Sequence, residues 1–293
     1  MKPLVVGTRG SALALAQAHL VIAELSARGI DAVERVITTD GDRTATTPRG
    51  DGAFVKAIQR ALTDGDVDLA VHSLKDVPTE GVQGLVLAAV PVRADAREVL
   101  VGATLSELPR NARVGTGSPR RAAQLRALRA DLQPVSIRGN VPTRIAKARG
   151  GEVDAVVLAR AGLVRLGLAS EAAEVFSTDA FPPAPGQGAL AIEARDGEAA
   201  AALASPLDHP PSRISAHAER EVLRMLGGGC MLPVAAYGSV SDGVLTLDAR
   251  VVSIDGTREA RARESGPVGN AQTIASTVAR GLENLGALEL LDA

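Results

Sequence analysis

Short apolar runs alternate with helical patterns along the first part of the chain. The run at residues 4–6 predicts a strand, and the pattern over residues 11–29, which closes on a glycine, predicts a helix. A strand over 31–39, a helix over 54–65 and a strand over 67–74 are predicted next. Strands and helices that alternate in this way are typical of an α/β protein.

Two internal echoes predict a second lobe that is similar to the first. Residues 6–17 (VGTRGSALALAQ) resemble residues 114–124 (VGTGSPRRAAQ), and residues 65–71 (GDVDLAV) resemble residues 151–157 (GEVDAVV). Because both echoes occur in the same order, they favour two similar α/β lobes over chance. A bilobal protein of this type usually binds its ligand in a cleft between the lobes, so we expect a central cleft.

The pattern changes after about residue 207. Before that point, residues 88–103 are the candidate crossover between the lobes and residues 181–195 the candidate return strand. Beyond it, a helix over 212–226 precedes alternating strands, and an amphipathic helix near 269–286 would cover them. These patterns predict a small α+β C-terminal domain, with the chain divided into lobe 1 (1–91 and 189–207), lobe 2 (92–188) and the C-terminal domain (208–293).

Composition narrows the class of protein. A chain of 293 residues with 46% hydrophobic residues is long and apolar enough for two or three domains with cores of their own. A net charge of -2 carries no global signature of nucleic-acid binding. One cysteine excludes an internal disulfide and, with a start that has no signal sequence, leads us to expect the reducing cytosol. No run approaches a membrane span, and the four histidines lack metal-ligand spacing, so we expect neither a membrane nor a metal.

Arginines follow several predicted strand-to-helix turns. In VGTGSPRR the strand ends at Thr116, Ser118 is a plausible helix N-cap, and Arg120 and Arg121 lie in the first helical turn. The helix dipole disfavours cations at this end of a helix, so two of them favour an anion that binds at the same place. A solvated basic helix start is the alternative. Comparable turns and loops elsewhere contribute Arg9, Ser11, Arg138, Arg144 and Arg165.

Several guanidinium groups at such turns favour a ligand with several carboxylates, because guanidinium binds carboxylate through two parallel hydrogen bonds. A phosphate ligand would be satisfied equally well by the same residues. Neither a GxxxxGK[ST] motif nor a GxGxxG motif is present, however.

The segment His72-Ser-Leu-Lys-Asp76 follows an apolar strand, so its polar side chains are expected at the carboxyl edge of a sheet, where open α/β sheets bind ligands. Asp76, beside the cation of Lys75, is suited to stabilising a developing positive charge or to moving a proton. A strand-end turn with a surface ion pair is the simpler alternative.

The single cysteine, Cys230, directly follows three glycines. Free cysteine is among the most buried residue types, so a small buried residue in a turn is one interpretation. Glycines also permit positive φ and close backbone approach, so a projecting loop that presents the thiol is the other. The local sequence leaves both open.

Eight motifs together resemble the porphobilinogen deaminase (hydroxymethylbilane synthase) family. They occur in the family's order and span residues 4 to about 237: VGTRGSALALAQ, GAFVK, DLAVHSLKDVPTE, VGTGSPRRAAQL, RGNVPTRI, LARAGLVRLG, PAPGQGALAIEAR and GGGCMLPV. The resemblance implies two periplasmic-binding-protein-like lobes and a monomeric, cytoplasmic transferase of tetrapyrrole and haem biosynthesis. Such an enzyme condenses four porphobilinogen molecules head to tail into hydroxymethylbilane and releases four ammonia molecules. It also implies a covalent dipyrromethane cofactor.

The resemblance also implies roles for individual residues. Asp76 matches the catalytic aspartate, which stabilises the cationic azafulvene-like species formed as ammonia leaves, and Cys230 matches the cysteine that holds the cofactor by a thioether. The remaining cofactor-binding positions are Lys75, Ser73, Thr116, Ser118, Arg120, Arg121, Arg138 and Gly188. The substrate-binding positions are Arg9, Ser11, Phe54, Lys56, Arg144, Arg165 and Gln187.

Three residues depart from the family pattern, and two other functions compete with it. Ala57 replaces a frequent glutamate, which puts a lid contact in doubt, while Gly117 and Pro119 replace a serine and a leucine. A non-enzymatic bilobal binding protein would leave Cys230 without a role. A cysteine hydrolase would need a basic partner near the thiol, and the neighbouring sequence offers none.

Overall fold

The computed structural model describes residues 2–38, 53–228 and 232–291. The chain divides into two compact units, one of residues 1–93 and 189–213 and the other of residues 94–188 and 214–293. Each unit has an α/β sheet of its own, and the second also contains the C-terminal sheet. Among the helices that the structure describes, none combines the length and apolar character needed to cross a membrane.

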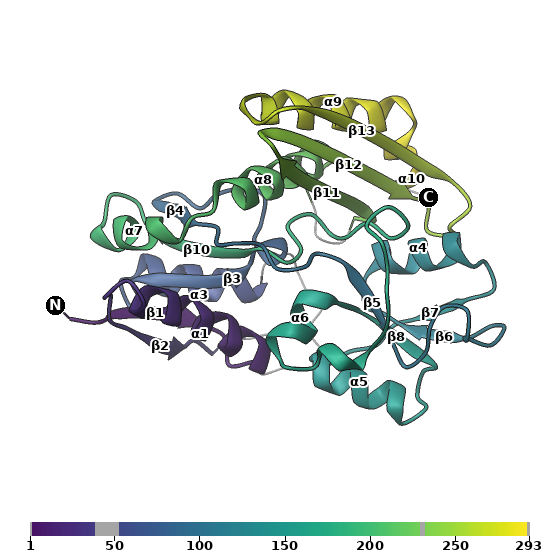
Figure 1. Cartoon of the computed structure of the whole chain (residues 1–293), viewed down its shortest axis with the longest axis horizontal. Coiled ribbons are helices and arrows are strands. Elements are labelled where there is room, and N and C mark those ends of the chain that lie inside the picture. The colour runs from purple at the N-terminus through teal and green to yellow at the C-terminus, as the bar shows by residue number, and fades with distance from the viewer. Residues whose placement is uncertain (1, 39–52, 229–231, 292–293) are drawn as a thin grey trace. The chain divides into compact units, whose positions relative to one another are not determined.

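Unit 1 is built on a five-stranded sheet with the order β2-β1-β3-β10-β4 (Figure 1). Its strands are β1 (Leu4–Thr8), β2 (Ala32–Val36), β3 (Leu69–Ser73), β4 (Leu85–Ala89) and β10 (Leu190–Arg195). The first three are parallel, and β10 is antiparallel to both of its neighbours. Helices α1 (Ala12–Ser26) and α7 (Ala199–Ala204) pack on one core cluster, and α3 (Ala53–Thr63) packs on another.

The α/β part of unit 2 repeats this plan with the order β7-β6-β8-β5-β9. Its strands are β5 (Glu98–Val101), β6 (Arg113–Gly115), β7 (Gln133–Val135), β8 (Ala155–Ala159) and β9 (Ala172–Val175). Strands β6, β7 and β8 are parallel, and β5 is antiparallel to its neighbours. The helices are α4 (Pro119–Leu128), α5 (Val141–Arg149) and α6 (Arg160–Arg165).

The sequence echoes coincide with equivalent positions in the two sheets. Val6 pairs with Leu69 in unit 1, and Val114 pairs with Ala155 in unit 2. These four residues occupy matching places in the two echoes, so the repeat extends to the register of the strands. The expectation of two similar α/β lobes is confirmed.

The C-terminal sheet consists of three antiparallel strands, β11 (Val234–Ser241), β12 (Val244–Val252) and β13 (Glu259–Pro267). Helices α8 (Pro210–Met225), α9 (Ala271–Asn284) and α10 (Ala287–Leu291) contribute to its core. This sheet with its covering helices is the α+β domain that the sequence predicts.

One predicted element is shorter than expected. The return strand, expected over 181–195, begins only at Leu190. Gly186 and Gly188 have positive φ angles of 76° and 86°, which a strand does not accommodate. The prolines of the same segment have no backbone N–H with which to join a sheet.

Candidate functional sites at the sheet edges

In unit 1, the candidate residues follow the carboxyl ends of the parallel strands β1 and β3. Arg9 and Ser11 lie between β1 and α1, and Ser11 is the N-cap of α1, where its Oγ accepts a hydrogen bond from the Ala14 N–H at 3.3 Å. Lys75 and Asp76 lie in a 3₁₀ turn directly after β3. The carboxyl ends of parallel strands meet at one edge of a sheet, which is where α/β proteins bind ligands.

The turn that carries Lys75 and Asp76 is anchored by its apolar neighbours. Leu74 is 1% exposed, and its N–H donates to the Ala189 carbonyl at 3.0 Å. Val77 is also buried and closes the turn through a bond to the Leu74 carbonyl at 3.2 Å. Asp76 itself is exposed, so its carboxylate is held on a fixed backbone and remains open to a ligand.

Ser73, the last residue of β3, has a partner that the motif alone does not reveal. Gln17 of α1 is buried, and its Nε2 donates to Ser73 Oγ at 2.7 Å. Because this bond uses the hydroxyl oxygen as acceptor, the hydroxyl hydrogen stays available for a ligand carboxylate. Gln17 ends the first sequence echo opposite Gln124, which is the signal that points to it.

In unit 2, Thr116 and Ser118 form the turn between β6 and α4. Thr116 is 4% exposed, and its Oγ1 accepts from the Ser118 N–H at 3.2 Å. Ser118 is the N-cap of α4, with its side chain accepting from Arg121 N, as the sequence predicts. A Cβ at Gly117 would lie 3.3 Å from the Ile137 carbonyl oxygen and 4.0 Å from Arg144 Nη2. The close approach is therefore to the Ile137 carbonyl oxygen, whereas the Arg144 guanidinium would be in ordinary contact with a Cβ at this position.

Arg120 and Arg121 are buried together around a carboxylate that sequence analysis does not identify. Glu98 of β5 is fully buried; its Oε1 accepts from Arg120 Nη2 at 2.5 Å and its Oε2 from Arg121 Nη2 at 2.7 Å. Burial lowers the pKa of Arg120, although the attraction of Glu98 opposes that fall. Two guanidinium groups share one carboxylate, so this buried cluster carries an excess of positive charge.

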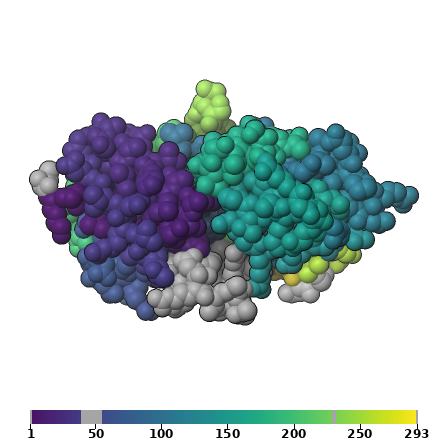
Figure 2. Space-filling view, turned by 90° about the horizontal axis from the view of Figure 1, so that it is seen from below, coloured from purple at the N-terminus to yellow at the C-terminus, as the bar shows by residue number. Residues whose placement is uncertain are grey.

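The other arginines of unit 2 differ in exposure. Arg138 is exposed after β7, while Arg144 in α5 donates from Nε to the Gly139 carbonyl at 2.9 Å. Arg165, the last residue of α6, is partly buried and donates to the Gly188 carbonyl at 2.7 Å. Burial lowers the pKa of Arg165 to about 10. Figure 2 shows the segment containing α5 and α6 in teal at the molecular surface.

Gln187 and Gly188 join the segment that precedes β10 to the segment that precedes β5. Gln187 is 0% exposed and donates from Nε2 to the Ala96 carbonyl at 2.7 Å. Gly188 accepts from the Ala94 N–H at 3.2 Å, and a Cβ at this glycine would lie 2.5 Å from the Ala94 carbonyl oxygen. Both residues therefore have structural contacts in addition to the ligand roles expected from the sequence.

Three further predicted positions are Phe54, Lys56 and Cys230. Phe54 and Lys56 both belong to the first turns of α3, and Lys56 is exposed. Cys230 lies outside the described residues, so the choice between a buried and a presented thiol stays open. In the described ranges, no three His, Cys, Asp or Glu side chains gather as metal ligands would.

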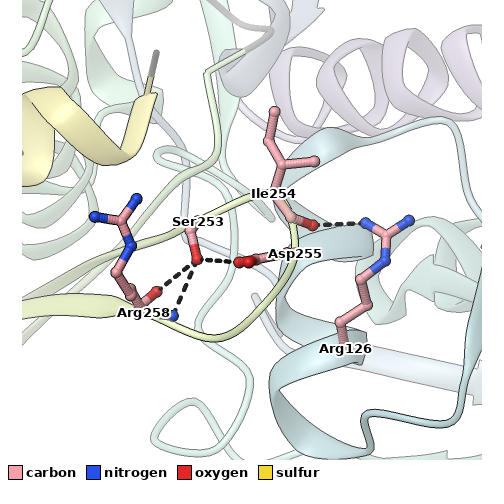
Figure 3. Close-up of a pocket in the computed structure, with 5 residues that line it drawn as sticks. All are labelled: Arg126, Ser253, Ile254, Asp255 and Arg258. Carbon is pink, nitrogen blue, oxygen red and sulfur yellow. Dashed lines mark hydrogen bonds between the residues drawn. The ribbon is translucent and has the colours of Figure 1, made fainter. Parts of the chain in front are cut away.

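A cavity of about 460 Å³ lies elsewhere in unit 2, between α4 and the turn that joins β12 to β13 (Figure 3). Arg126 of α4 donates to the Ile254 carbonyl at 2.7 Å, and Ser253 Oγ donates to Asp255 at 2.6 Å. None of the residues singled out from the sequence lines this cavity. Its polar groups bond to one another and hold the turn against α4.

Two family models and several known proteins together match almost the whole chain. A family model described as porphobilinogen deaminase, dipyromethane cofactor binding domain, matches residues 4–202, and the porphobilinogen deaminase C-terminal domain model matches residues 214–284. The porphobilinogen deaminase of Desulforudis audaxviator is 47% identical over 300 residues, covering 99% of this chain and 97% of that relative. The porphobilinogen deaminase of Deinococcus deserti is 45% identical over 313 residues, covering 100% and 99%.

Solved structures include a similar periplasmic substrate-binding protein of an ABC transporter from Coxiella burnetii. It shares 16% sequence identity with this chain, and the match covers 73% of this chain and 94% of the other with a TM-score of 0.44.

Proposed function

This chain belongs to the porphobilinogen deaminase family, and from that premise we propose that it joins four porphobilinogen molecules head to tail into hydroxymethylbilane, releasing four ammonia molecules. It is a transferase of tetrapyrrole and haem biosynthesis, of the hydroxymethylbilane synthase class. The full-length match to the family carries this proposal. The non-enzymatic binding protein, the alternative weighed from the sequence, gains no support from a match of this length.

The charge of the candidate residues supports a ligand that is rich in carboxylates. Arg165 is partly buried, its pKa is lowered by burial alone, and it donates a hydrogen bond to a neutral carbonyl oxygen, that of Gly188. Glu98 balances only one of the two buried guanidinium groups of Arg120 and Arg121. Buried cations are stable when an anion pairs with them. Each pyrrole unit of the substrate brings an acetate and a propionate, which suit guanidinium donors.

A dipyrromethane cofactor fits the same residues, because its two pyrrole units also carry an acetate and a propionate each. When bound, it supplies the covalently held pyrrole end to which substrate units are joined. Cys230 would hold it through a thioether. The residues that would bind its carboxylates and pyrrole rings are Ser73, Lys75, Thr116, Ser118, Arg120, Arg121, Arg138 and Gly188. Ser73, with its hydroxyl hydrogen free of the Gln17 bond, would donate to a carboxylate.

Asp76 would act on the substrate that is losing ammonia. Positive charge develops on the pyrrole ring in that step, and a carboxylate close to the pyrrole N–H stabilises it. The 3₁₀ turn holds the Asp76 backbone while its side chain is exposed, as this role requires. The residues that would bind incoming substrate are Arg9, Ser11, Phe54, Lys56, Arg144, Arg165 and Gln187.

Several further points complete the proposal. The functional domains would be 1–91 with 189–207, 92–188 and 208–293, with Asp76 in the first and Cys230 in the last. The protein would be a cytoplasmic monomer that acts on porphobilinogen and requires neither nucleic acid nor a membrane. Gel filtration with light scattering tests the monomer directly.

Incubation with porphobilinogen tests the function. We expect ammonia release with formation of the linear tetrapyrrole, and intact mass should show an adduct of two pyrrole units that is absent from Cys230→Ser. Asp76→Ala should keep the fold and lose nearly all turnover. Stoichiometric binding of porphobilinogen by the wild type without ammonia release would refute the enzyme and favour a binding protein. An active wild type of unmodified mass would refute the attachment at Cys230.

A further inference from the structure

A buried carboxylate lies inside unit 1, where neither the motifs nor the proposed mechanism use it. Glu193 of β10 is 7% exposed, and its two oxygens accept from Gln59 Nε2 at 3.0 and 3.1 Å. Gln59 belongs to α3 and is itself 5% exposed. Since a carboxylate withdrawn from water needs a hydrogen-bonding or charged partner, this contact ties helix α3 to strand β10.

His72 brings strand β3 to the same carboxylate. In the antiparallel pairing of β3 with β10, His72 lies opposite Ala191 and Glu193 lies opposite Ala70, so His72 and Glu193 are diagonal neighbours on one face of the sheet. His72 Nε2 is 3.2 Å from Glu193 Oε2, and the His72 side chain is 4% exposed. The two atoms are within ion-pair distance but lack hydrogen-bond alignment, so His72 is a close polar neighbour of the carboxylate without a hydrogen bond to it.

Stability alone does not explain this polar cluster. On the same face of the sheet, α3 packs in an apolar core cluster that includes Ile58, Leu62, Val67 and Ala70, and Ala70 lies opposite Glu193 in the pairing of β3 with β10. A buried polar or charged group set among such neighbours is often no more stabilising than an apolar pair of similar volume. What the hydrogen bonds add is a defined position of α3 along the sheet, because an apolar contact lacks their directionality.

The cluster lies close to two of the proposed functional segments. Helix α3 follows β2 and precedes β3, which are both parallel to β1, so its first turn lies at the carboxyl edge of the sheet, the edge at which the turn that carries Asp76 follows β3. Lys56 is exposed in that first turn and precedes Gln59 by three residues, about 4.5 Å along the helix axis. Asp76 follows His72 by four residues.

We propose that Glu193 is a positioning residue: through Gln59 and His72 it sets the first turn of α3, and with it Lys56, relative to the turn that carries Lys75 and Asp76. The inference rests on the proposed function, in which Lys56 binds a carboxylate of the substrate. Loss of the tie would move Lys56 away from that carboxylate, while the groups that act on the leaving ammonia stay in place.

Steady-state ammonia release from porphobilinogen by the cofactor-loaded enzyme tests the inference. Gln59→Leu should raise KM about tenfold and change kcat less than about threefold, because it displaces a binding group. In a Lys56→Ala background the same substitution should change KM less than about twofold, since its effect passes through Lys56. Ile58→Val is the matched control, because it alters the neighbouring buried position of α3 without touching the tie.

Exchange of the two partners separates the tie from general stability. Glu193→Leu should raise KM as Gln59→Leu does, because both variants remove the hydrogen bond, and Glu193→Gln combined with Gln59→Glu should return KM to within about threefold of wild type, because donor and acceptor have changed places. Equal KM values for Gln59→Leu and wild type, additive effects with Lys56→Ala, or a Lys56→Ala variant with normal KM would each overturn the inference. A wild type without turnover would refute the proposed function first, and this inference with it.

Discussion

Arg165 offers a test in which stability and substrate binding change in opposite directions. Its guanidinium is partly buried, it donates to the Gly188 carbonyl at 2.7 Å, and no carboxylate of the described residues forms an ion pair with it. Burial lowers its pKa to about 10. A fall of that size corresponds to about 3 kcal/mol of solvation lost by the charged form in the folded protein.

Substitution of Arg165 by methionine removes the charge and keeps an unbranched side chain. The variant no longer pays the cost of desolvating a charge, but it loses the hydrogen bond to Gly188, which is worth about 1 kcal/mol. Because Arg165 is partly exposed, solvent screening makes the desolvation cost smaller than the pKa shift alone indicates. We therefore expect ligand-free Arg165→Met to be more stable than wild type by about 1–2 kcal/mol. The folded-state pKa lies below that of the unfolded chain, so the penalty of the charge is fully present at neutral pH and disappears only above about pH 10.

Urea denaturation of the cofactor-free protein, followed by far-ultraviolet circular dichroism, measures the gain. Arg110→Met makes the same chemical change at an exposed position and should stay within about 0.5 kcal/mol of wild type. In the loaded enzyme, Arg165→Met should raise KM for porphobilinogen about tenfold or more, because a charge-assisted hydrogen bond is lost. A variant that is less stable than wild type, or one with unchanged KM, would refute the reasoning.

Three further predictions concern stability. Gly188→Ala should lower the free energy of unfolding by at least about 2 kcal/mol in urea denaturation, whereas Gly197→Ala, which shares a positive φ but has open space around the new Cβ, should cost less. Glu98→Ala leaves the two buried guanidinium groups of α4 without their carboxylate and should cost about 3–5 kcal/mol in the same assay; a loss below about 1 kcal/mol contradicts the buried pair. Asp255 has a pKa lowered to about 2, first by the Ser253 hydroxyl. Because that value lies below its ordinary one, the carboxylate stabilises the fold above about pH 4 and loses this effect as the pH falls towards 2. Thermal denaturation of Asp255→Asn over this range should therefore show a shallower acid limb, and an unchanged limb would disprove the role.

Local patterns along the chain were sufficient to predict most elements of the fold. The periodicity over residues 11–29 predicts helix α1, which spans Ala12–Ser26, and Ser118 is the helix N-cap that the SPRR pattern indicates. These features depend on neighbours within one or two turns, so the sequence contains the information directly. The two internal echoes also predict a second, similar lobe, and Val6 and Val114 do occupy equivalent registers in their sheets.

The partners of buried charges depend on strands that are distant along the chain. Glu98 and Glu193 each appear in an apolar strand as one acidic residue, and nothing nearby identifies Arg120 and Arg121 or Gln59 as the groups that bond to them. Sheet order and register bring these side chains together.

The chain alone was enough to identify the α/β plan, the repeat, the family and the residue types expected at the site, because periodicity, turn residues and motifs are local and ordered along the sequence. The tertiary structure decided which of those residues are already occupied by the protein. Arg120 and Arg121 bond to Glu98, Ser73 accepts from Gln17, and Arg165 has a neutral partner. The physical reason is that burial and hydrogen-bond partnership arise from contacts across the sheet, which local sequence patterns do not encode.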